Sequence, residues 1–203
     1  MSRILLHVCC APCGIAPLRD LRDRGFDVTA FWYNPNIHPY SEYSRRLETV
    51  RSYLDSETVP LIEKDDYDLV EHLRRSAFRE ADRCIYCYDM RLRQTAVYAR
   101  KGKFDVFSTT LLFSSYMDRE SVIRAGKAVA TEIGIGFFEA DWRHLFRESV
   151  DVSREKEIYR QNYCGCIYSE AERFAGLDLG RVAVGSGVKK KTGKAKKNRG
   201  GKP

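Results

Sequence analysis

Long apolar runs are absent from this chain. Of its 203 residues 43% are hydrophobic, but no stretch approaches the roughly 20 apolar residues that a membrane-spanning helix needs. The short apolar run after residue 3 leads directly into cysteines, without the small-residue cleavage site of a signal peptide. We therefore expect a cytoplasmic protein with no membrane segment, in which residues 1–178 form a single domain.

Acidic residues are absent from residues 181–203, which contain nine of the 35 Lys and Arg residues. The formal net charge of +7 arises entirely from this segment, because the rest of the chain carries 26 basic against 28 acidic residues. The segment contains several glycines and no apolar periodicity, so we predict a disordered basic tail over residues 179–203. Such a tail either improves solubility or attracts a polyanion such as RNA without sequence specificity.

The sequence also lacks the glycine-rich turn that binds phosphate in many nucleotide-binding α/β proteins. Those proteins place glycines and a hydroxyl residue after the first strand, where backbone N–H groups surround the phosphate. Residues 9–14 here read Cys-Cys-Ala-Pro-Cys-Gly. Proline removes an N–H donor, and thiolates repel phosphate. The turn therefore argues against ATP chemistry.

Apolar periodicity predicts strands that alternate with helices. Strands are predicted at residues 3–8, 26–33, 59–62, 104–109 and 136–140, and helices at residues 15–24, 42–54, 90–101, 119–133, 153–161 and 165–175. The alternation predicts an α/β fold of three layers, with a parallel sheet of about five strands between helices. Ligands bind such sheets beyond the carboxyl ends of the strands, where the strand order reverses. The first strand-to-helix turn is therefore the expected site, covered by the C-terminal helices.

Cysteines are the most informative residues present. The seven fall into three tight groups, which are Cys9, Cys10 and Cys13, then Cys84 and Cys87, then Cys164 and Cys166. An odd number of cysteines in a reducing compartment argues against disulfides. The spacing of Cys84 and Cys87 is typical of ligands in zinc and iron–sulfur sites. The grouping therefore indicates soft-metal binding or thiol redox chemistry.

The spacing within the groups suggests two metal centres. Successive side chains such as Cys9 and Cys10 are expected to diverge, and the single residue between Cys164 and Cys166 suggests thiolates that face different centres. The seven thiolates divide most simply as four plus three. Four complete a [4Fe–4S] cluster, and three leave a metal with an open coordination position for catalysis.

Other interpretations compete with this one. Two structural zinc ions, with His7 as an eighth ligand, would make the chain a non-catalytic zinc-binding and RNA-binding module. Cys84 and Cys87 alone would suffice for a cytosolic thiol oxidoreductase. The cysteines could also be ordinary core residues, although packing by itself rarely produces three tight groups.

Four longer motifs resemble the epoxyqueuosine reductases of the QueH type. The motifs are His7-Val8-Cys9-Cys10-Ala11-Pro12-Cys13, Asn34-Pro35-Asn36-Ile37-His38-Pro39, Cys84-Ile85-Tyr86-Cys87-Tyr88 and Tyr159-Arg160-Gln161-Asn162-Tyr163-Cys164-Gly165-Cys166-Ile167-Tyr168-Ser169. The resemblance runs from about residue 4 to about residue 175. It implies a HUP-like, Rossmann-like fold and an enzyme that reduces epoxyqueuosine to queuosine at the wobble position of tRNA, with electrons from an external donor.

The resemblance also implies the cofactors and their ligands. The family uses a [4Fe–4S] cluster beside a mononuclear iron. Carried over to this sequence, the cluster ligands are Cys10, Cys84, Cys87 and Cys164. The single iron is then expected to bind Cys9, Cys13 and Cys166.

Further site residues are expected around these ligands. Candidate proton donors are the acidic or phenolic residues that flank cysteines, namely Tyr86, Tyr88, Asp89 and Tyr163. Candidate substrate-binding residues, mostly from the segment after the second strand, are Tyr33, Asn34, Asn36, Tyr40 and Arg46.

Two pairs of basic residues lie beyond these candidates. Arg91 and Arg93 follow Cys87 on a predicted helix. By default we expect both arginine side chains to face solvent. The alternative is that they contact phosphate or balance the negative charge of a cluster. His72 and His144 are expected at the surface.

Overall fold

The computed structural model describes residues 1–115 and 117–179. The elements follow in the order β1 (Arg3–His7), α1 (Ala11–Asp23), β2 (Asp27–Trp32), α2 (Tyr40–Ser56), β3 (Leu61–Glu63), α3 (Leu69–Ser76), α4 (Arg83–Lys101), β4 (Val106–Thr109), α5 (Arg119–Ile133), β5 (Gly136–Phe137), α6 (Phe146–Glu155) and α7 (Ile167–Phe174). Short 3₁₀ turns, Thr110–Leu112 and Arg143–Leu145, precede α5 and α6.

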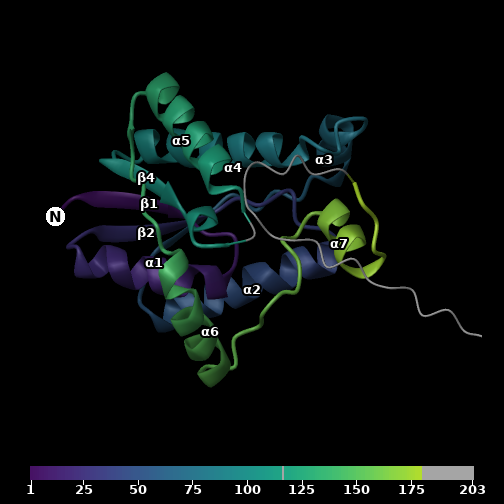
Figure 1. The fold of residues 1–203 in the computed structure, drawn as a ribbon. Coiled ribbons are helices and arrows are strands. Elements are labelled where there is room, and N and C mark those ends of the chain that lie inside the picture. Colours follow the sequence, from purple (N-terminus) through teal and green to yellow (C-terminus); the bar gives the residue numbers. More distant parts are fainter. Residues whose placement is uncertain (116, 180–203) are drawn as a thin grey trace, which may run out of the picture.

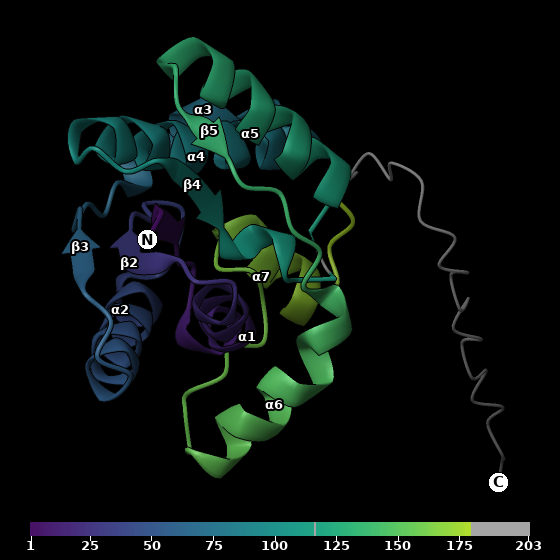
Figure 2. The same cartoon turned by 90° about the vertical axis from the view of Figure 1, so that its left-hand side faces the viewer.

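All strand pairs in the sheet are parallel, in the order β3-β2-β1-β4-β5. Helices α1, α2 and α6 cover one face, and α3, α4 and α5 lie on the other (Figures 1 and 2). Helix α7 lies beyond the carboxyl ends of the strands (Figure 1). This arrangement confirms the predicted three-layer, Rossmann-like α/β fold.

The hydrophobic core is centred on the middle strand of the sheet, β1. Ile4, Leu5 and Leu6 are fully buried, because helices cover both faces of a parallel sheet. The register pairs Leu5 with Thr29 of β2 and with Phe107 of β4. The strand order reverses between β1 and β4, which places the switch point of the sheet at the carboxyl end of β1.

The predicted strands are confirmed, although most are shorter than expected, and one helix is wrong. The chain does not form a helix over residues 153–161, because α6 ends at Glu155 and Glu157 adopts a φ of 52°. Helix α3 was not predicted, and α1 and α4 begin several residues earlier than predicted. The earlier start of α4 places Cys84 and Cys87 on the helix itself.

Among the described residues, no helix is long and apolar enough to cross a bilayer. From residue 180 onward, the predicted basic tail lies outside the described part of the chain.

Candidate metal centre

The switch point of the sheet is held together by side chains from three strand ends. His7 ends β1, and its Nδ1 lies 2.8 Å from Thr109 Oγ1 at the end of β4. Its Nε2 lies 3.2 Å from Asn34 Oδ1, after β2, and the amide of Asn34 donates to the Val8 carbonyl. These bonds fix the direction in which the chain leaves β1, immediately before the first cysteines.

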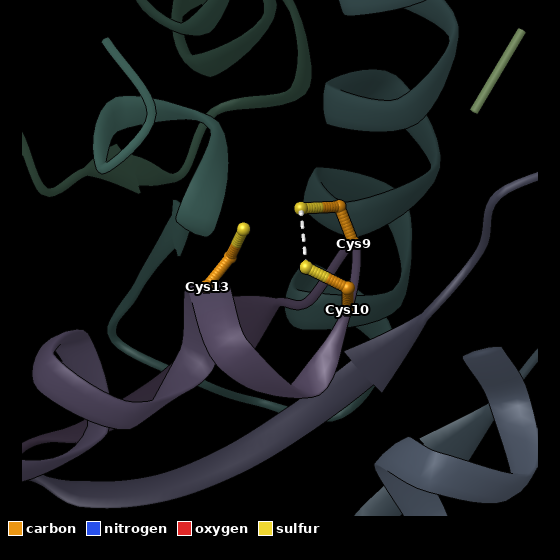
Figure 3. Close-up of side chains that lie close together, drawn as sticks. All are labelled: Cys9, Cys10 and Cys13. Carbon is orange, nitrogen blue, oxygen red and sulfur yellow. Dashed lines mark hydrogen bonds between the residues drawn. The ribbon is translucent and has the colours of Figure 1, made fainter. Parts of the chain in front are cut away.

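Cys9, Cys10 and Cys13 form a compact triad at this point. Their three Sγ atoms all lie within 4.8 Å of one another, and Figure 3 shows Cys9 and Cys10 converging beside Cys13 at the start of α1. The expectation that Cys9 and Cys10 diverge is therefore wrong. Cys10 is the extended N-cap of α1, so the chain turns between the two residues. The triad could hold a metal ion.

Hydrogen bonds within the triad favour one thiolate. The pKa of Cys9 is lowered well below its usual value, mainly by hydrogen bonds from Cys10 and Cys13, with a further bond from the Thr110 hydroxyl. Burial raises the pKa of Cys10, and the bond to Cys10 raises that of Cys13. The positive end of α1 also favours negative charge here. Of the three thiols, Cys9 is therefore the one that most favours the thiolate form.

Cys84 and Cys87 lie one turn apart on α4, which turns both toward the same side. Burial raises the pKa of Cys87 to about 12. The guanidinium of Arg91, on the next turn, donates to the Cys87 Sγ at 3.0 Å and to its carbonyl at 3.0 Å. Although burial acts to lower the pKa of Arg91, the nearby Cys87, Cys9 and Cys164 raise it overall. Arg91 is buried, so the default expectation of a solvated face is wrong for this residue.

Cys164 and Cys166 lie on the segment between α6 and α7. The guanidinium of Arg46 on α2 donates to the carbonyls of Tyr163 and Cys164 at 3.1 and 3.0 Å, and its charge is paired with Glu42. The His38 N–H donates to the Gly165 carbonyl at 2.8 Å. These contacts anchor the segment to α2 and to the loop after β2.

Gly165 is essential to this anchoring. Its φ is +125°, and a Cβ added there would lie 2.9 Å from the buried Ile37 side chain. We therefore expect Gly165→Ala to lower the free energy of unfolding by about 1–3 kcal/mol and to reduce metal retention. Thermal unfolding and metal analysis measure the two effects. Gly176→Ala is the matched control, because Gly176 also has a positive φ, of +68°, but open space around its Cβ; it should show the backbone strain without loss of metal. Wild-type stability and metal content in Gly165→Ala would contradict this role.

A cavity of about 520 Å³ brings the three cysteine groups together. Six of the seven cysteines line it, and the seventh, Cys10, completes the triad. The rest of the lining combines apolar side chains such as Phe113 and Phe146 with Arg91 and Arg160. Residues from the turn after β1, from α1, from α4 and from the segment before α7 thus line one cavity.

Two of the four candidate proton donors line this cavity, namely Tyr88 and Tyr163. The Tyr88 hydroxyl contacts Met117 Sδ at 3.6 Å, and the Tyr163 hydroxyl donates to the His38 carbonyl at 2.5 Å. Burial raises the pKa of both phenols. Tyr86 and Asp89 are not among the described lining residues, and Asp89 forms an ion pair with Arg93 instead.

Of the five candidate substrate-binding residues, only Asn36 is among the described lining residues of the cavity. Asn36 lines the cavity, and its Oδ1 has no hydrogen-bond partner among the described residues. Asn34 and Arg46 are buried and hold the chain around the site. Tyr33 packs under Lys64, 4.3 Å from its ring centroid, and Tyr40 is 61% exposed on α2.

The structure adds two residues to the site. The Gln161 amide donates to Cys10 Sγ at 2.8 Å; the motif that contains Gln161 was the only signal for it in the sequence. His72 is buried and lines the cavity, its ring 4.8 Å from that of His38, so the prediction of a surface position is wrong. Burial lowers the pKa of both histidines to about 4. His144 is exposed, as predicted.

Comparisons with known proteins agree with the motifs. The family model of epoxyqueuosine reductase QueH matches residues 4–172. An epoxyqueuosine reductase QueH of Dehalococcoides mccartyi is 38% identical over 85% of this chain and 94% of its own length. Those of Acinetobacter baylyi and Thermotoga maritima are 34% and 36% identical, over 93% and 85% of this chain and 90% and 93% of their own lengths. The chain therefore belongs to the epoxyqueuosine reductase QueH family.

Proposed function

We propose that this chain reduces epoxyqueuosine in tRNA to queuosine, at a site built from all seven cysteines. The observation that carries the proposal is the cavity, which gathers cysteines from three distant segments in a chain of this family. The family assignment favours this reaction over a zinc-binding and RNA-binding module or a thiol oxidoreductase. A dithiol enzyme, in particular, would have no use for the other five thiols.

The donor set fits iron–sulfur chemistry. All seven cysteines offer soft sulfur ligands, as iron–sulfur centres require. We assign Cys10, Cys84, Cys87 and Cys164 to a [4Fe–4S] cluster, and Cys9, Cys13 and Cys166 to a single iron. Because Cys10 lies within 4.8 Å of Cys9 and Cys13, the two centres would be immediate neighbours. When bound, they would supply electrons and a Lewis acid for the epoxide oxygen.

The reaction breaks both C–O bonds of the epoxide and forms a C=C bond. It consumes two electrons and two protons, and the oxygen leaves as water. The phenols of Tyr88 and Tyr163 line the cavity and carry a proton at neutral pH, as tyrosines do, so either is a candidate proton donor. Burial raises the pKa of both phenols, which makes them weaker acids than an exposed tyrosine. Phe113 and Phe146 stack with ring centroids 5.7 Å apart and form an apolar wall of the cavity, against which the ring of the substrate would pack.

The partners follow from this reaction. The substrate is a tRNA that carries epoxyqueuosine in its anticodon loop, where an unpaired base can enter a cavity with little unpairing. Arg160 and Arg173 in the cavity lining offer positive charge for its phosphates. An external electron donor would supply the electrons. The basic residues from 181 onward would add nonspecific attraction to tRNA.

Anaerobic purification followed by iron, sulfide and zinc analysis tests the cofactor. We expect about five iron and four sulfide ions per chain, and an absorbance band of the cluster at about 400 nm. The loaded protein, given a chemical reductant and tRNA containing epoxyqueuosine, should then form queuosine. Zinc without sulfide would refute the assignment of the centres. A fully loaded protein that leaves the epoxide intact would refute the reaction.

A further inference from the structure

Three arginines are buried in the described part of the chain, and two of them are neutralised by carboxylates. Arg46 pairs with Glu42, and Arg83 pairs with Glu172. Arg91 is only 4% exposed, yet no carboxylate of the described residues lies within salt-bridge distance of it. A buried cation without a counter-charge is strongly unfavourable, so the charge that balances Arg91 must come from another source.

The contacts of Arg91 identify that source. Its guanidinium donates to the Sγ and the carbonyl of Cys87. The side chain lines the same cavity as Cys9 and Cys164 and interacts electrostatically with both. The cysteines near Arg91 therefore belong to both proposed centres. Among residues 1–115 and 117–179, the only groups within reach that can carry a balancing negative charge are these thiols and whatever they bind.

We propose that Arg91 is the counter-charge of the metal site, and that it sets the reduction potential of the cluster through its contact with Cys87. This inference rests on the proposed function. Four thiolates give an iron–sulfur cluster a net negative charge, and the added electron of the reduced state makes that charge larger. A fixed cation with an N–H donor on a ligand sulfur stabilises the reduced state more than the oxidised state. Arg91 therefore makes the cluster easier to reduce.

Replacement of Arg91 should move the potential in a defined direction. We expect the midpoint potential of Arg91→Gln to be more negative than that of the wild type, because the charge and the contact with the sulfur are both lost. Arg91→Lys keeps the charge but cannot donate to the Sγ and the carbonyl of Cys87 in the same way. Its midpoint potential should therefore lie between those of the wild type and Arg91→Gln. Arg93→Gln is the matched control, since Arg93 lies on the exposed side of the same helix with Asp89 and Glu132 as partners.

A redox titration of each purified protein, followed by absorbance or electron paramagnetic resonance, measures the potentials. Circular dichroism and iron content show whether each variant is folded and loaded. Loss of iron from Arg91→Gln but not from Arg91→Lys would support the inference, because binding would then need the charge. Unchanged potentials in both loaded variants would overturn it. Loss of iron from both variants would also overturn it, since Arg91 would then act only in packing.

This test separates the inference from the proposed function. A wild-type protein without a cluster refutes the function. A wild-type protein with a cluster, whose potential does not respond to Arg91→Gln, refutes the role of Arg91 alone. An increase in KM for tRNA with no change in potential would likewise refute that role and make Arg91 a substrate-binding residue.

Discussion

Cys87→Ala is expected to abolish the iron–sulfur cluster and, with it, all turnover. Cys84 and Cys87 lie one turn apart on α4, and the proposed assignment makes both of them cluster ligands. Loss of either leaves the cluster with three thiolates and a cavity open around the missing ligand. Sulfide should fall to background and iron from about five to at most one per chain. Inductively coupled plasma analysis and a sulfide assay on anaerobically purified protein measure this loss.

The same substitution should also lower thermal stability. Binding of a metal centre to a folded site contributes to the free energy of folding, and loss of the cluster leaves Arg91 buried without its counter-charge. Ile85→Ala is the matched control, because Ile85 lies between the two cysteines but is 57% exposed. It should retain the cluster and the wild-type melting temperature. Wild-type amounts of iron and sulfide in both Cys84→Ala and Cys87→Ala would show that this pair does not bind the cluster.

Cys9→Ala is expected to spare the cluster but remove the single iron and abolish turnover. The adjacent substitution, Cys10→Ala, is expected to remove the cluster instead. The two residues are neighbours in sequence, and their Sγ atoms are 3.9 Å apart. The contrast therefore tests which thiol belongs to which centre rather than the general tolerance of the turn. Iron-to-sulfide ratios and the absorbance of the cluster distinguish the two outcomes.

The geometry of the triad makes this contrast decisive. Because Cys9, Cys10 and Cys13 converge within 4.8 Å, they could together bind one ion and leave Cys84, Cys87, Cys164 and Cys166 for the cluster. In that case Cys10→Ala would lose only one iron and keep its sulfide. That result would replace our assignment of Cys10 and Cys166 while preserving two neighbouring centres.

Secondary structure was predicted best where local patterns dominate. Helix α5 was predicted with its observed limits, because Gly134 ends it in the left-handed conformation. Residues 153–161 contain no glycine or proline and favour a helix locally. The structure instead extends this segment after Glu155, where Tyr159 donates to Glu42 and Gln161 donates to Cys10. Tertiary contacts thus outweighed helix propensity in residues 156–161, the segment that leads to Cys164 and Cys166.

The residues around the thiols were harder to predict. Arg91 and Arg93 are two positions apart on one helix and look equivalent in the sequence. Only the tertiary structure shows that Arg91 is buried against Cys87, whereas Arg93 is partly exposed and pairs with Asp89 and Glu132. His72 was misplaced for the same reason, because α3 was not predicted and its buried side could not be assigned.

The sequence by itself indicated the chemistry of the site, since seven thiols in three groups point to soft-metal binding or thiol redox chemistry whatever the fold. It also determined the fold class, because the alternation of strands and helices follows from local periodicity. The tertiary structure alone decided which thiols are neighbours and which arginine contacts them. Spacing along the chain fixes distances only within a turn or a helix, whereas the distance from Cys9 to Cys87 or Cys164 depends on the crossovers of the sheet.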